Sequence, residues 1–197
     1  YISVTGVQTC ALPISLTFTN ALTLATTGTG TRTLTLTGSG NGSLASIIPN
    51  QSSNATALTK SGAGTWTLSS ASSSYTGVTT ISAGTLSVSY LAAGGSNSNI
   101  GASSNAASNL VINGGTLQYT GSTGYSTDRL FTIGTGTSGA TIDASGSATL
   151  TFTNALTLAT TGTNTRTLTL TGSGNGSLAS IIPNDGSSKD RKSTRPE

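Results

Sequence analysis

Polar and apolar residues alternate with a period of two in many short segments of this chain, and this alternation constrains the fold more than any other feature. Residues 33–37 read Thr-Leu-Thr-Leu-Thr, and the pattern recurs at residues 16–19, 65–68, 85–88 and 116–119. Strict alternation sends one set of side chains to one face of a sheet and the other set to the opposite face. Glycine and asparagine, which favour turns, separate the segments. The pattern predicts an all-β fold of short strands.

Composition removes most kinds of catalytic or metal site. Ser, Thr and Gly make up half of the 197 residues, only 7% are charged, and the chain has no His and one Cys. A histidine-based triad, a disulfide pair and a four-cysteine zinc site are therefore excluded. No apolar run approaches the roughly 18 residues of a membrane span. The net charge of +3 comes largely from residues 189–197, so the rest of the chain offers no basic patch for nucleic acid.

One long segment occurs twice. Residues 16–50 and 150–184 are identical at 34 of 35 positions, and only Gly30 and Asn164 differ. The chain therefore reads as a slice of a longer tandem array. Such an array extends a solenoid naturally and a closed sandwich poorly, so the sequence favours a parallel β-helix (solenoid) over residues 16–188. At roughly 20–25 residues per coil, this segment would form about seven or eight coils.

The alternation also predicts which side chains face the interior of the solenoid. Inward positions are mostly Leu, so similar side chains should stack on one another in coils about 4.8 Å apart. The residues expected to point inward are Leu34, Leu36, Trp66, Leu68, Leu86, Leu117, Phe152, Leu168 and Leu170.

The two ends resemble translated sequencing-adapter sequence. Residues 9–14 can be encoded by ACG TGT GCT CTT CCG ATC, and the reverse complement of that DNA encodes Asp-Arg-Lys-Ser-Thr-Arg, which is residues 190–195. We therefore expect residues 1–15 and 189–197 to be non-native and to join no regular coil.

Residues 58–88 carry a specific motif. It reads Lys-Ser-Gly-Ala-Gly-Thr-Trp-Thr-Leu at 60–68, Tyr-Thr-Gly at 75–77 and Gly-Thr-Leu at 84–86. This resembles the autotransporter-associated β-strand repeat, although serines at 72–74 replace an asparagine-based turn. The resemblance implies a right-handed parallel β-helix in the passenger of a secreted or surface-displayed bacterial protein, which an outer-membrane barrel anchors.

Two patterns of enzyme sites have simpler explanations. Residues 134–139 match the dinucleotide pattern G-x-G-x-x-G, but no helix-forming sequence follows to hold a pyrophosphate, so these are turn glycines. Glycoside hydrolysis needs two facing carboxyl groups, and the candidates are Asp128, Asp143 and Asp185. Asp128 and Arg129 are adjacent and are expected to form a surface ion pair or a turn cap. Catalytic, cofactor and metal sites are therefore not expected.

Aromatic side chains supply the candidates for ligand binding. Trp66 and Tyr119 share the phase of inward leucines and should lie in the core. Tyr75 and Tyr125 lie in polar, Ser- and Gly-rich stretches, so they are expected to be exposed and able to stack on sugars.

These observations lead to a non-enzymatic structural and display segment of a bacterial surface protein. A glycan-binding or surface-binding adhesin module is the alternative. A degraded polysaccharide lyase or hydrolase, and an ice-binding solenoid with outward threonine rows, are further alternatives. The expected partners are neighbouring repeats, the outer-membrane barrel and surface glycans, without nucleic acid. Because terminal coils expose unpaired backbone groups, we also expect the chain to self-associate end to end, which sedimentation would detect.

Overall fold

The computed structural model describes residues 15–24, 29–134, 139–161 and 166–183. The expectations for residues 1–14 and for the tail at 189–197 lie outside this part of the chain. Within it the fold is all-β except for one short 3₁₀ turn, η1 (Ala107–Asn109), and every pairing between strands is parallel. The prediction of an all-β parallel solenoid is therefore confirmed.

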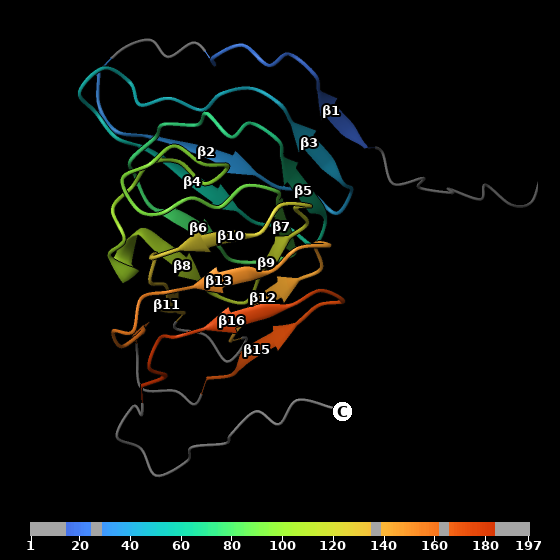
Figure 1. Ribbon diagram of the computed structural model, residues 1–197. Coiled ribbons are helices and arrows are strands. Elements are labelled where there is room, and N and C mark those ends of the chain that lie inside the picture. The colour runs from blue at the N-terminus through green and yellow to red at the C-terminus, as the bar shows by residue number, and fades with distance from the viewer. Residues whose placement is uncertain (1–14, 25–28, 135–138, 162–165, 184–197) are drawn as a thin grey trace, which may run out of the picture.

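Three sheets run along the solenoid, which has about six turns. The seven-stranded sheet contains β1 (Leu16–Phe18), β3 (Gly42–Leu44), β5 (Thr65–Leu68), β7 (Thr85–Val88), β9 (Thr116–Tyr119), β12 (Ala140–Ala144) and β15 (Leu168–Thr171). The six-stranded sheet contains β2 (Arg32–Leu36), β4 (Thr56–Lys60), β6 (Thr79–Ile81), β8 (Leu110–Ile112), β11 (Thr132–Ile133) and β14 (Ala159–Thr160). The three-stranded sheet contains β10 (Tyr125–Thr127), β13 (Leu150–Phe152) and β16 (Gly176–Leu178). Figure 1 shows the three sheets as separate columns of strands.

Each coil visits the three sides in a fixed order. From β9 onward the chain passes from the seven-stranded sheet to the three-stranded sheet, then to the six-stranded sheet, and back to the seven-stranded sheet. In earlier coils the third side has no named strand. Backbone hydrogen bonds close it instead, for example from Tyr75 N to Ile48 O (3.2 Å) and from Ala102 N to Tyr75 O (2.7 Å).

The coils are longer and fewer than the sequence predicted. Their lengths follow from one row of paired positions in the seven-stranded sheet, which runs through Leu16, Gly42, Trp66, Leu86, Leu117, Ile142 and Leu170. The shortest coil lies between Trp66 and Leu86, and the longest lies between Leu86 and Leu117. The expectation of seven or eight coils is wrong because several coils are longer than it assumed. The longest coil includes a loop of residues 89–109 between β7 and β8, which we call the 89–109 loop.

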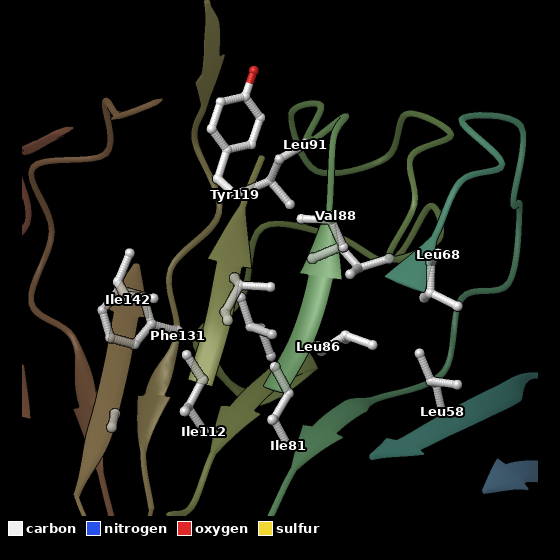
Figure 2. Packing of buried hydrophobic residues seen from close by; sticks show 14 of the residues in the cluster. Leu58, Leu68, Ile81, Leu86, Val88, Leu91, Ile112, Tyr119, Phe131 and Ile142 are labelled. Atoms are coloured by element: carbon white, nitrogen blue, oxygen red, sulfur yellow. The ribbon is translucent and has the colours of Figure 1, made fainter. Parts of the chain in front are cut away.

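Inward side chains form rows along the axis. One row in the seven-stranded sheet runs through Leu44, Leu68, Val88, Tyr119 and Ala144, all of which are buried. Figure 2 shows the middle of this interior, where side chains of neighbouring coils lie against one another. Fully burying one leucine-sized side chain contributes about 1.5–3 kcal/mol, so the rows provide much of the stability.

The predicted inward set is correct apart from the two ends. Leu34 is only half-buried, and Leu170 is 52% exposed although its strand partner Ile142 is buried. Both lie in edge strands, β2 and β15, so a neighbouring strand covers them on one side only. The other large exposed apolar side chains in the described residues also lie in the first or last coils, and they are Leu16, Phe18, Leu22, Leu156, Ile181 and Ile182.

Candidate functional site

The motif at residues 58–88 forms the coil made by β4, β5, β6 and β7, and a buried lysine lies at its corner. Lys60 has no exposed surface and occupies an inward row between Leu36 and Ile81. Its Nζ donates hydrogen bonds to Ser61 O (3.1 Å), Gly62 O (2.8 Å) and to a carbonyl of the next coil at residue 83 (3.0 Å). Burial lowers the pKa of Lys60. The lysine thus joins the corners of two successive coils.

Glycines let the corners approach that closely. Gly62 and Gly84 have φ angles of +77° and +61°, in the left-handed region that favours glycine. A Cβ added to Gly84 would lie 2.5 Å from Gly62 O and 2.7 Å from the Nζ of Lys60. The Lys-x-Gly part of the motif therefore has a structural role, because lysine supplies the donors and glycine leaves the space.

Tyr75, one of the two predicted ligand-binding residues, is completely buried. Its hydroxyl is hydrogen-bonded to Thr79 Oγ1 (2.8 Å), and burial raises its pKa. The expectation that Tyr75 is exposed is wrong, because the 89–109 loop of the following coil covers it. Ala102 N donates to its carbonyl, and a Cβ at Gly101 would lie within 3 Å of its ring. Tyr75 is therefore part of the core.

The 89–109 loop is held by a buried arginine from the next coil. Arg129 is 2% exposed, and its guanidinium donates to the carbonyls of Ala92 (3.0 Å), Ser103 (3.0 Å), Gly101 (2.9 Å) and Ser96 (3.4 Å). It also donates to Ser103 Oγ (2.9 Å). Burial lowers the pKa of Arg129, and the adjacent Asp128 opposes this shift. Because Arg129 is buried, the expected surface ion pair is wrong.

Asp128 fixes the rim of the same loop. Its carboxylate accepts hydrogen bonds from Gly94 N (2.7 Å) and from Asn105 Nδ2 (2.9 Å). The prediction of a turn cap therefore describes Asp128 correctly. Asn99 acts from inside the loop, since its Oδ1 accepts from Ser89 N (2.9 Å) and Tyr90 N (2.6 Å). Sequence reasoning missed this set of loop contacts, although an isolated Asp-Arg pair in a nearly uncharged chain was its visible signal.

Tyr125, the second predicted ligand-binding residue, belongs to a cluster of three tyrosines. Its ring lies edge-on to Tyr90 (centroids 4.5 Å apart, 81° between planes) and to Tyr119 (6.5 Å, 83°). Tyr119 is buried, as predicted, whereas Tyr90 and Tyr125 are half-exposed. The pair Tyr90 and Tyr125 is the aromatic surface beside the 89–109 loop, whose exposed positions include Ser96, Asn97 and several other small polar residues.

The remaining sequence candidates form no common site in the described residues. Asp143 is turned toward Gln118, whose Nε2 donates to it (2.9 Å), and it also accepts from Ser145 Oγ. Asp185 lies outside the described residues. Residues 135–138 of the glycine-rich segment lie outside the described residues, and strand β12 follows that segment. The described residues contain no group of three or more metal-ligating side chains and no helix with the length and apolarity of a membrane span.

Comparison with known proteins finds two similarities. A family model for the passenger-associated transport repeat matches residues 58–88, the coil that contains Lys60. A segment of the adhesin BmaC autotransporter of Brucella suis biovar 1 (strain 1330) is 54% identical over 91 residues, which is 46% of this chain and 3% of that protein. This chain therefore spans only a small part of the length of its relative. No solved structure matches.

The motif therefore has both the sequence of a known repeat and a defined place in the fold. Its lysine, glycines and inward apolar residues build one coil of the solenoid, and the chain continues the same sheets on both sides of that coil. Residues 58–88 therefore match the passenger-associated transport repeat, and part of the chain is similar to a segment of an autotransporter adhesin.

Proposed function

We propose that this chain is a non-enzymatic structural and display segment of an autotransporter passenger, linked in the full-length protein to an outer-membrane translocator barrel. The observation that carries the proposal is the continuity of the solenoid. Parallel sheets and buried rows pass through the repeat coil without interruption, and each coil rests on the next. Such stacking makes a stiff spacer whose length grows with the number of coils.

The non-enzymatic part of the proposal is supported by where the polar groups lie. In the described residues the buried cations Lys60 and Arg129 donate to backbone carbonyls, and Arg129 also donates to Ser103 Oγ. The described carboxylates, Asp128 and Asp143, accept hydrogen bonds from separate structural partners. A screen of the purified chain against polysaccharides should give no cleavage, and reproducible cleavage would overturn this part of the proposal.

Ice binding is disfavoured by the outward rows. The outer row of the seven-stranded sheet runs Thr17, Ser43, Thr67, Ser87, Gln118, Asp143 and Thr171. Gln118 and Asp143 interrupt the hydroxyl side chains, so this sheet lacks the flat and regular threonine array that such a solenoid needs.

Surface display provides a direct test of the structural role. The chain would be placed between an N-terminal epitope tag and an outer-membrane translocator, and digestion by external protease would be followed. Leu117 is fully buried, and its neighbour Thr116 on β9 points outward. We expect Leu117→Asp, which should cost about 4 kcal/mol or more, to make the displayed segment protease-sensitive. Thr116→Asp is the matched control and should remain resistant. Equal sensitivity of the two variants, or sensitivity of the unchanged chain, would contradict the proposal.

A second candidate function is adhesion through glycans, favoured by the half-exposed pair Tyr90 and Tyr125. Aromatic faces flanked by small hydroxyl and amide groups suit an uncharged sugar, and the relative is named an adhesin. A glycan array with the unchanged chain tests this function. Binding should be lost in Tyr125→Ala and kept in Thr116→Asp. If no glycan binds, or if Tyr125→Ala binds equally, the tyrosine pair is not a glycan site.

A further inference from the structure

The two copies of the duplicated segment lie on different sides of the solenoid. In the first copy, residues 16–50, β1 and β3 belong to the seven-stranded sheet and β2 to the six-stranded sheet. In the second copy, residues 150–184, the corresponding strands β13 and β16 belong to the three-stranded sheet and β15 to the seven-stranded sheet. Figure 1 shows β13 and β16 in a different column of strands from β1 and β3.

The contacts within each copy are nevertheless the same. Phe18 pairs with Leu44 in the first copy, and Phe152 pairs with Leu178 in the second. The bridge between residues 23 and 47 recurs between residues 157 and 181. The hydroxyl of Ser46 donates to the carbonyl of residue 20 (2.6 Å), and its counterpart at 180 donates to residue 154 (2.8 Å). Each copy is therefore the same coil placed in a different rotational position.

The two copies pair with coils on opposite sides. Leu36 of the first copy pairs with Lys60 of the following coil, whereas its counterpart Leu170 pairs with Ile142 of the preceding coil. All three sides offer inward positions that alternate with outward ones, so a Leu-Thr-Leu strand fits any of them. Nothing in the duplicated sequence selects one side.

The spacing between the two copies explains the rotation. Starting at Phe18, the row of the seven-stranded sheet advances by five coils to Ala144, and Phe152, the counterpart of Phe18, then lies on the next side of the coil. One unit of the array, from Phe18 to its counterpart Phe152, therefore contains five complete coils and one further side, which is about a third of a coil.

We infer that successive units of the array turn by about one third of a revolution, so that each 89–109 loop, with its Tyr90 and Tyr125, faces a different side from the loop of the preceding unit. The same side recurs only after three units. This inference rests on the proposed display function and specifies its geometry. The display surrounds the rod, and its partner must approach from all directions, as a loose network of uncharged carbohydrate chains does.

Distances between spin labels in the full chain, with Cys10 replaced by Ser, test the rotation. Ser43 and Thr171 lie in one outward row, five coils apart, so labels at S43C and T171C should be separated by about 24 Å along the axis. Ser126 and Ser177 lie in one outward row of the three-stranded sheet, two coils apart, so labels at S126C and S177C should be separated by only about 10 Å.

The opposite arrangement gives a different result. If both copies occupied the same side, Ser177 would take the place of Thr171 in the row of Ser43. S43C and S177C would then give the separation expected here for S43C and T171C, and S126C and S177C would lose their short distance, which would overturn the inference. All four positions face outward, so the labels leave the core intact. These distances depend on neither surface display nor sugar binding, so failure of the proposed function leaves this result unchanged.

Discussion

Two buried cations in the described part of the chain stabilise this solenoid in different ways. Lys60 donates to corner carbonyls of its own coil and the next, and its contacts are formed by the repeat motif itself. Arg129 donates to the carbonyls of four residues of the 89–109 loop, which precedes it in the chain. Both Arg129 and this loop lie outside the repeat motif. Lys60 replaces one aliphatic side chain in a row of aliphatic side chains, whereas Arg129 is the centre around which the 89–109 loop is ordered. The comparison shows that the repeat motif stabilises the coil itself, whereas Arg129 orders the loop that projects from the coil.

Loss of Arg129 should have the largest effect. Arg129→Ala leaves several buried carbonyls without donors, and we expect the free energy of unfolding to fall by about 3–5 kcal/mol. Hydrogen exchange should accelerate first in residues 89–109. Urea unfolding followed through the single Trp66 measures the global effect. Arg129→Lys keeps the charge but has fewer hydrogen-bond donors, so its free energy of unfolding should lie between those of the unchanged chain and Arg129→Ala. Slow exchange of the loop in Arg129→Ala would show that other contacts hold it.

A glycine in the repeat corner should rank second. Gly84→Ala places a Cβ 2.5 Å from two carbonyl oxygens and forces a side chain into a positive φ, so we expect a loss of about 1–3 kcal/mol. Gly95 also has a positive φ, +83°, but no atom lies within 4 Å of an added Cβ. Gly95→Ala therefore isolates the backbone strain and should cost less. Equal losses would mean that the corner yields to the added carbon.

Removing the charge of Lys60 should matter less than removing that of Arg129. Lys60→Met keeps an unbranched side chain between Leu36 and Ile81 and gains from losing a buried charge, but it leaves carbonyl oxygens without a donor. These contributions oppose each other, and we expect a net loss of about 1 kcal/mol. Chemical denaturation measures it. A loss as large as that of Arg129→Ala would remove the distinction between the two cations.

The pH dependence should be the smallest effect. Because burial lowers the pKa of Lys60 below its ordinary value of 10.5, the unfolded chain binds more protons than the folded chain as the pH approaches that value. The free energy of unfolding should therefore rise with pH in this range, and the rise should be absent in Lys60→Met. Measurements should stop at about pH 9, above which the tyrosines begin to ionise. An identical slope in both proteins would contradict this assignment.

Local sequence patterns predicted what depends on local contacts. Alternation identified the strands and the inward side chains, such as Leu86 and Leu117, because a strand has only two faces and one of them must be buried. The phase of Trp66 and Tyr119 placed both correctly in the core. The motif at 58–88 matches the passenger-associated transport repeat, and its lysine and glycines interact within one coil and the next.

Contacts between distant parts of the chain could not be predicted in this way. Tyr75 lies in a stretch of serines that reads as exposed, and only the loop of the following coil, at Gly101 and Ala102, buries it. The sequence also predicts that the side chain of Arg129 is a surface charge, because nothing local indicates that the 89–109 loop buries it. The predicted number of coils was wrong for a related reason. Alternation identifies the strands but does not indicate how many residues the loops between them contain.

The unequal coils have a consequence for how such a protein can change over generations. The shortest and the longest coil lie next to each other in the same sheet, yet their strands remain paired residue by residue. The additional residues of the longest coil form a loop outside the sheets, so the rows of paired residues on either side are kept. A gene that encodes such a solenoid can therefore gain or lose loop segments at the coil corners while the strands stay paired, and residues of a neighbouring coil, as Arg129 does here, then order the new surface feature.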